Sequence, residues 1–120
     1  MFEIRGDVAQ QMREEAIGDN RRHIEAALKH DHPDLASRWS NAQLTRLVDY
    51  AIDRADEYGL HSERSIFVFC CAMFTYGLQF DTDSRHDHWT RDVLDDLTLE
   101  EDIKRSLLEY RIQLDTGRDV

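Results

Sequence analysis

The feature that most constrains this chain is a run of nine consecutive apolar residues, Ile66 to Phe74, in a sequence otherwise rich in charge. Ser62 and Glu63 precede the run and favour a helix N-cap and a first helical turn, and Gly77 follows it. The aromatic and β-branched residues in the run would also suit a buried strand, but the sequence offers no second strand to pair with it. We therefore expect a helix over residues 63–76 that is apolar on all sides and enclosed by other helices.

The segment before the apolar run has the clearest helical pattern. Ser40 and Gln43 fit a capping box, in which each side chain bonds the backbone N–H of the other residue. Gly59 supplies the left-handed residue that commonly ends a helix. The apolar residues between them recur at helical spacing: Leu44, Leu47, Val48, Ala51, Ile52 and Ala55. This spacing predicts an amphipathic helix that packs on the apolar one.

Two further helices are expected after the apolar run. Asp87 is placed to cap a short helix. Thr98 and Glu101 fit a second capping box, which opens a final helix. The expected apolar face of that helix consists of Leu99, Ile103, Leu107, Tyr110 and Leu114. Residues 115–120 are expected to form a loose tail.

Apolar residues also recur at near-helical spacing between Asp7 and Lys29, with a bend or break expected around residues 18–20. Pro33 should end this first helix, because a proline excludes its predecessor from the helical region. Apolar surface left over on the first helix would allow a homodimer. The periodicities together predict an all-α fold, a single compact bundle of about five helices over residues 1–120 with the apolar helix buried at its centre.

Charge and composition limit the classes of partner. Fifteen basic residues against twenty-five acidic ones give a net charge of −10, which repels nucleic acids and anionic lipids and favours a basic protein partner. The longest apolar run is about half the length of a membrane span, and the first residues lack a signal-peptide core, so we expect a cytoplasmic protein. The only cysteines, Cys70 and Cys71, are adjacent and are expected to be buried free thiols.

No pattern in the sequence identifies a catalytic centre. "HDH" occurs at residues 30–32 and 86–88, but such clusters in polar loops are common, so neither a metal nor another cofactor is expected. Residues 81–88 begin like a calcium loop, yet Arg85 and His86 stand where an oxygen ligand and a glycine are required. The two His-Asp dipeptides leave one enzymatic alternative open, a small metal-dependent His-Asp phosphohydrolase.

Acidic residues crowd the segment that follows the apolar run. Such a run is usually a solvated face that also complements a helix N-terminus. Alternatively, its carboxylates could steer a basic partner toward an aromatic anchor. A tryptophan in this position could also be a lid on the core. The candidate partner-binding residues are Asp83, Asp87, Trp89, Asp92, Asp95 and Asp96.

Residues 47–96 resemble a group of small helical proteins encoded beside bacterial type VI secretion effectors. The shared pattern is a helix ending in "RA..YG", a "SER" cap, an apolar helix, then "G..FD" and "W...(I/V)L.D". The positions that carry it here are Arg54, Ala55, Tyr58, Gly59, Ser62, Glu63, Gly77, Phe80, Asp81, Trp89, Leu94 and Asp96. The chain departs from the pattern in its "SRHDHW" loop, where the group has a proline before the tryptophan.

The resemblance implies a binding protein of a secretion-effector gene cluster and not an enzyme. The first expectation is an immunity protein that neutralises a toxin by occluding it. An adaptor or chaperone that helps to load an effector is the alternative. The matched residues look like determinants of the fold, so they indicate the group better than they locate a contact surface.

Overall fold

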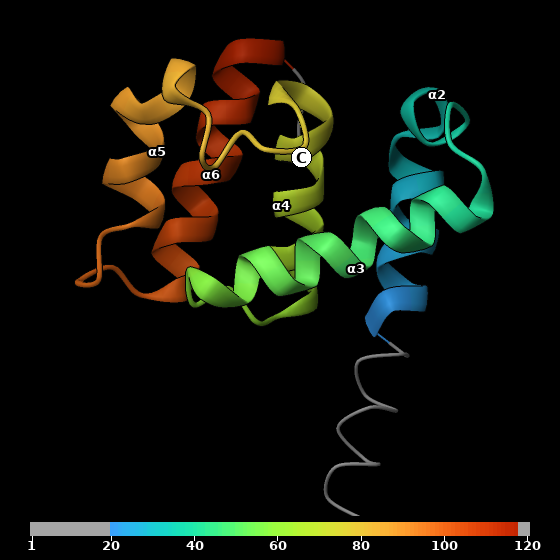
Figure 1. Ribbon diagram of the computed structural model, residues 1–120, viewed down its shortest axis with the longest axis horizontal. Coiled ribbons are helices and arrows are strands. Elements are labelled where there is room, and N and C mark those ends of the chain that lie inside the picture. The colour runs from blue at the N-terminus through green and yellow to red at the C-terminus, as the bar shows by residue number, and fades with distance from the viewer. Residues whose placement is uncertain (1–19, 118–120) are drawn as a thin grey trace, which may run out of the picture.

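The computed structural model describes residues 20–117. Within this range the chain forms helices and turns and no β-strand, which confirms the expected all-α bundle. Residues 20–31 are helical, and the elements that follow are α2 (Pro33–Ala36), α3 (Asn41–Glu57), α4 (Glu63–Tyr76), the 3-10 turn η1 (Ser84–His86), α5 (Asp87–Leu94) and α6 (Glu101–Thr116) (Figure 1). The apolar pattern expected before Asn20 and the last three tail residues lie outside the described range.

Helix α4 forms the centre of the fold. Every residue from 66 to 73 is at most 4% exposed, and both α3 and α6 pack on the helix (Figure 1). The Ser62 side chain accepts a hydrogen bond from the backbone N–H of Ser65, and Gly77 follows the last helical residue with a φ of 111°. The helix expected over residues 63–76 is therefore confirmed at both ends. By area, each large side chain buried here contributes about 1.5–3 kcal/mol.

Helix α3 also agrees with its sequence pattern. The Gln43 backbone N–H donates to Ser40 Oγ at 3.1 Å, and the Ser40 N–H donates to Gln43 Oε1 at 2.8 Å, which completes the capping box. Gly59 follows the C-cap with a φ of 78°, a conformation that glycine adopts without strain. The residues of α3 that are buried in the core are Leu44, Leu47, Val48, Ala51 and Ala55.

The helix over residues 20–31 contributes Ile24 and Leu28 to the same core. It ends just before His32, and Pro33 begins α2, as a proline at the first helical position permits. The buried His32 ring lies 6.0 Å from the Phe67 ring, centroid to centroid, and its Nε2 lies 3.5 Å from Cys71 Sγ. This contact joins the first helix to α4.

The two cysteines are free and buried, as expected. Burial raises the pKa of the Cys70 thiol well above its ordinary value, and it raises the pKa of Cys71 to about 12. Both side chains therefore stay protonated at neutral pH. Cys71 therefore meets the His32 ring as a neutral thiol rather than as an activated thiolate.

The expected cap of the short helix is wrong. The Asp83 side chain, not that of Asp87, accepts the capping hydrogen bond, from the backbone N–H of Arg85 at 3.0 Å. That bond opens η1, and α5 continues from η1 without a side-chain cap of its own. Because the chain enters α5 through a 3-10 turn, the capping position moves four residues toward the N-terminus, and Asp87 becomes the first helical residue.

The second expected capping box is also wrong. Helix α6 begins at Glu101, and the Thr98 hydroxyl donates instead to Asp96 Oδ1 at 2.6 Å. The Glu101 carboxylate accepts hydrogen bonds at 2.7 Å from the backbone N–H groups of His61 and Ser62. Burial opposes ionisation of Glu101, but these bonds outweigh it and lower its pKa. The Glu101 side chain thus bonds the backbone N–H groups at the N-terminus of α4 rather than those of α6.

The expected apolar face of α6 is wrong as well. Its buried residues are Lys104, Leu108 and Ile112. The expected face points to solvent, with Ile103 47%, Leu107 39%, Tyr110 59% and Leu114 61% exposed, while Leu99 in the preceding turn is half-buried. Helix α6 also includes residues 115 and 116, which were expected to lie in the tail, and Gly117 ends it in the left-handed conformation.

Candidate functional site

The buried amine of Lys104 accounts for the orientation of α6. Its Nζ donates to the backbone oxygen of Tyr58, at the end of α3, and to that of Leu94, the last residue of α5, both at 2.9 Å. The C-terminal ends of two helices carry partial negative charge, which a cation stabilises. With Lys104 held there, Leu108 and Ile112 face the core. The opposite side of the helix must then face solvent.

The exposed side of α6 carries a continuous apolar strip. We call Ile103, Leu107, Tyr110 and Leu114 the α6 stripe. Their spacing of four, three and four residues places them on one face of the helix. In Figure 1, α6 lies between α5 and α4, and it packs against both of them. The stripe is the side of α6 that neither neighbour buries.

An acidic segment lies at the N-terminal end of the stripe. Residues 92–102, which we call the acidic segment, contain six acidic residues and no basic one. Asp92, Asp95 and Glu100 are exposed and form no ion pair with another residue that the structure describes. Leu97, at the tip of the turn between α5 and α6, is 94% exposed. An apolar strip that ends in free carboxylates has the composition of a protein contact surface.

The other candidate residues have local partners. Asp96 accepts hydrogen bonds from the hydroxyl and backbone N–H of Thr98, which lower the pKa of its carboxyl. Asp102, which extends the same segment, pairs with Arg105 at 3.2 Å. These two carboxylates therefore add negative charge to the surface, although each already bonds one neighbouring residue.

Asp83 and Asp87 are also engaged. Asp83 accepts hydrogen bonds from the Arg85 side chain and backbone, which lower its pKa to about 2. Asp87 pairs with Arg91, one helical turn away, at 3.2 Å. Each carboxylate has a cation beside it, so both offer less free negative charge than their place in the sequence suggests.

Trp89 lies in the core at 6% exposure. Its ring stacks on Phe80 with centroids 6.0 Å apart, and it lies 5.0 Å from the Tyr76 ring. The Arg111 guanidinium covers the ring at 5.3 Å from its centroid. The sequence left two roles open for Trp89, an anchor for a partner and a lid on the core, and the structure places it in the core. Trp89 is therefore not exposed for direct contact with a partner.

A buried ionic network fixes the end of α3. The Asp81 carboxylate is fully buried and accepts hydrogen bonds from Arg54 Nε at 2.9 Å and from the Tyr58 hydroxyl at 2.7 Å. The hydrogen bond to Asp81 raises the pKa of Arg54, and burial together with Asp81 raises the pKa of Tyr58. All three residues belong to the pattern "RA..YG…FD". They connect α3 to the loop after α4 and so determine the fold.

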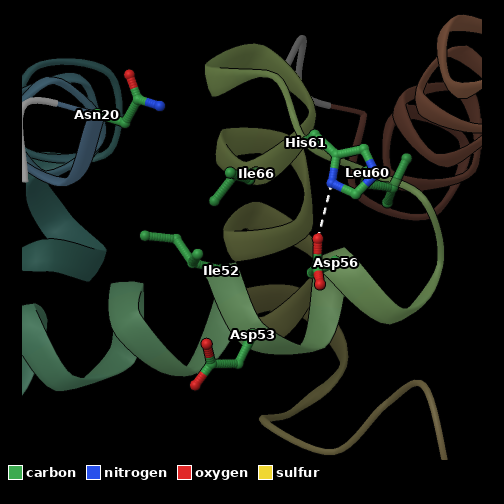
Figure 2. A pocket seen from close by; sticks show the side chains of 7 residues that line it. All are labelled: Asn20, Ile52, Asp53, Asp56, Leu60, His61 and Ile66. Atoms are coloured by element: carbon green, nitrogen blue, oxygen red, sulfur yellow. Dashed lines mark ion pairs between the residues drawn. The ribbon is translucent and has the colours of Figure 1, made fainter. Parts of the chain in front are cut away.

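A pocket of about 400 Å³ lies between the first helix, α3 and the start of α4 (Figure 2). Ile52, Leu60 and Ile66 line it with apolar side chains, and Figure 2 shows the Asp56 carboxylate paired with the His61 ring, at 2.8 Å. Both members of this pair are largely exposed. The pocket therefore has an apolar lining and a polar rim, without a set of buried polar groups that converge on one point.

Neither a metal centre nor a membrane span is found in residues 20–117. No three or more His, Cys, Asp and Glu side chains in this range lie close enough together to hold a metal ion. None of the helices described has the length and apolar character needed to cross a bilayer. Comparison of the chain with protein-family models, with curated proteins and with solved structures gave no match.

The sequence indicates the acidic residues of this surface but not the two features that organise it, the outward orientation of the α6 stripe and the buried Lys104. The spacing of the α6 stripe is evident in the sequence, but on its own it predicts a buried face. Lys104 carries no signal of its own, because a lysine in an amphipathic helix usually reaches solvent.

Proposed function

We propose that this protein is a binding protein of a bacterial secretion-effector gene cluster, and that it neutralises a toxin by occluding it. The single observation that carries the proposal is the exposed α6 stripe next to the acidic segment. Together they offer apolar contact area and free negative charge in one place. The resemblance to proteins encoded beside type VI secretion effectors supplies the biological setting.

Occlusion requires a contact with a dry centre and a charged rim. Apolar side chains at the centre exclude water, and carboxylates at the rim meet lysine or arginine on the partner. The α6 stripe would supply the centre, with Asp92, Asp95 and Asp96 at the rim. The net charge of −10 would also speed the approach of a basic toxin at low ionic strength.

Charge reversal in the acidic segment should weaken the complex with the product of the neighbouring effector gene. We expect Asp92→Lys combined with Asp96→Lys to lower the affinity roughly tenfold, mostly through slower association. The salt dependence of binding should fall as well, because fewer opposite charges are then screened. Isothermal titration at two salt concentrations measures both effects.

Asp34→Lys is the matched control. Its change of charge equals that of each single substitution in the double variant, and it lies in α2, at the opposite end of the molecule from α5 (Figure 1). It should change the affinity far less than the double variant. Equal losses from the control and the double variant would contradict a localised acidic contact. A genome neighbourhood without an effector gene would contradict the proposed secretion-effector setting.

Two alternatives are separated by simple readouts. An immunity protein protects a cell that expresses the toxin, whereas an adaptor leaves toxicity unchanged and is needed for export of the effector. A His-Asp phosphohydrolase would be purified with a stoichiometric metal ion and would lose activity on His86→Ala. Stoichiometric metal with such a loss would contradict the inhibitor proposal.

A further inference from the structure

The α6 stripe has the spacing of a helix-packing seam. Apolar residues separated by four, three and four positions occupy the a and d positions of a heptad, which a second helix fills with its own apolar side chains. From Ile103 to Leu114 the seam extends about 16 Å, or three helical turns. Ser106 and Gln113 border it on one side, so no charge interrupts that edge. This geometry favours a helical partner segment of about three turns.

The protein cannot bury this seam by rotating α6. Rotation would withdraw Lys104 Nζ from the backbone oxygens of Tyr58 and Leu94, and it would expose Leu108 and Ile112, which are at most 3% exposed. Four large apolar side chains therefore stay on the surface of one helix among the residues that the structure describes. A contiguous apolar strip of this kind marks an interaction surface more often than a solvated face.

The distribution of charge around the seam specifies the partner. Asp95 and Glu100 are exposed near the N-terminal end of α6, and both lack an ion pair within the described chain. At the other end, Asp115 already pairs with Arg111 at 3.1 Å. Among residues 20–117, negative charge therefore remains unmatched at one end of the seam only. A bound segment needs positive charge at that end.

A second copy of this chain does not supply that charge. A parallel pair would bring two acidic segments together. An antiparallel pair would place each acidic segment against Asp115, whose neighbouring Arg111 is already engaged by Asp115 and lies over the Trp89 ring. Two chains of charge −10 also repel each other. The charges disfavour a homodimer through this surface.

We propose that the α6 stripe and the acidic segment bind an amphipathic helix of about three turns whose apolar seam ends in lysine or arginine. Basic residues are most favourable in the last turn of a helix, where they complement its dipole. The C-terminal end of the bound helix then lies at the acidic segment, which makes it antiparallel to α6. This inference rests on the proposed function for the partner being a protein, and it adds the class of segment that is bound.

The test uses synthetic helical peptides as probes of the full chain. The first peptide has leucine at a and d positions over three turns, uncharged residues elsewhere and lysines in its last turn. The second has glutamates in place of the lysines, and the third has the lysines in its first turn. We expect the first peptide to bind at least tenfold more tightly than either of the others, measured by fluorescence anisotropy.

Variants of the protein locate the peptide. Leu107→Glu and Tyr110→Glu should each weaken binding of the first peptide by roughly thirtyfold, because each removes a central apolar contact. Leu78→Glu and Tyr50→Glu are the matched controls, since both replace an exposed apolar side chain outside α6 and should leave binding unchanged. Circular dichroism confirms that each variant is folded.

Several results would overturn the inference. They are no binding of the first peptide, equal binding of the lysine and glutamate peptides, or equal losses from control and stripe variants. If analytical ultracentrifugation shows a homodimer that Leu107→Glu dissociates, the α6 stripe binds a second copy of the chain and not a basic helix. If the first peptide binds as expected but the effector does not, the proposed function is wrong and the inferred helix-binding surface is supported. If the effector binds with unchanged affinity to Leu107→Glu, the surface fails and the function stands.

Discussion

Asp81→Ala should lower the free energy of unfolding by about 3 kcal/mol, measured by urea denaturation at neutral pH. The substitution removes a fully buried carboxylate that accepts hydrogen bonds from Arg54 and Tyr58. Breaking a buried ion pair from one side typically costs about 3–5 kcal/mol, because the remaining charge is left without its partner. The lower end of that range applies, because Arg54 keeps its ion pair with Glu57 at 2.9 Å.

Asp92→Ala is the control for this change. Asp92 is an exposed aspartate without an ion pair in the described chain, so its loss should change stability by less than about 0.5 kcal/mol. Tyr58→Phe should fall between the two, at about 1 kcal/mol, since it removes one hydrogen bond to the same carboxylate. Equal stability of Asp81→Ala and wild type would mean that this network does not hold α3 to the loop after α4.

Lys104→Met should have an effect of similar size, about 2–4 kcal/mol in the same urea experiment. Methionine fills a comparable volume but donates nothing, so the backbone oxygens of Tyr58 and Leu94 each lose a hydrogen bond from a charged donor. Such bonds contribute about 1.5–3 kcal/mol each, partly offset here by the favourable burial of methionine. The structural consequence should be looser attachment of the C-terminal ends of α3 and α5 to α6.

Arg105→Met provides the comparison for Lys104, one position along the same helix. Arg105 pairs with Asp102 at 3.2 Å and with Glu109 at 3.9 Å on the helix surface. Surface pairs of this kind contribute about 0–1 kcal/mol. If Lys104→Met were as mild as Arg105→Met, the two helix ends would not depend on the Lys104 ammonium.

The elements that were predictable from sequence are those specified by local signals. The nine-residue apolar run predicted α4, because a helix without a polar face has to lie inside the protein. Ser40 with Gln43, and the glycines that follow α3 and α4, defined helix ends through contacts within four residues. Interactions between residues this close in sequence depend little on the rest of the fold, so they can be predicted from the sequence.

The orientation of α6 was not predictable in the same way. Its sequence contains two overlapping apolar patterns, the α6 stripe and a second one with Leu108 and Ile112. Periodicity alone favoured the stripe, because it has more members. The choice is made by tertiary contacts, since Lys104 reaches the ends of two other helices that lie 46 and 10 residues away in sequence. The role of Glu101 is not predictable for the same reason, as its partners are the backbone N–H groups of His61 and Ser62, just before α4.

The candidate surface shows the same division. The acidic segment was visible as a cluster of residue types, and its place between α5 and α6 followed from the expected helices. Which carboxylates are free was not visible, because Asp83 and Asp87 acquire their cations only when the chain forms η1 and α5. The position of Trp89 in the core likewise depends on Phe80 and Tyr76.

The orientation of α6 underlies both the proposed function and the binding surface, and thiol labelling tests it most directly. The wild type provides the background, because Cys70 and Cys71 are buried and their raised pKa keeps them protonated. In Leu107→Cys the new thiol should react with a thiol reagent about as fast as an unfolded peptide. In Leu108→Cys it should react only as fast as the protein unfolds. A protected thiol in Leu107→Cys together with a reactive one in Leu108→Cys would contradict the outward-facing stripe.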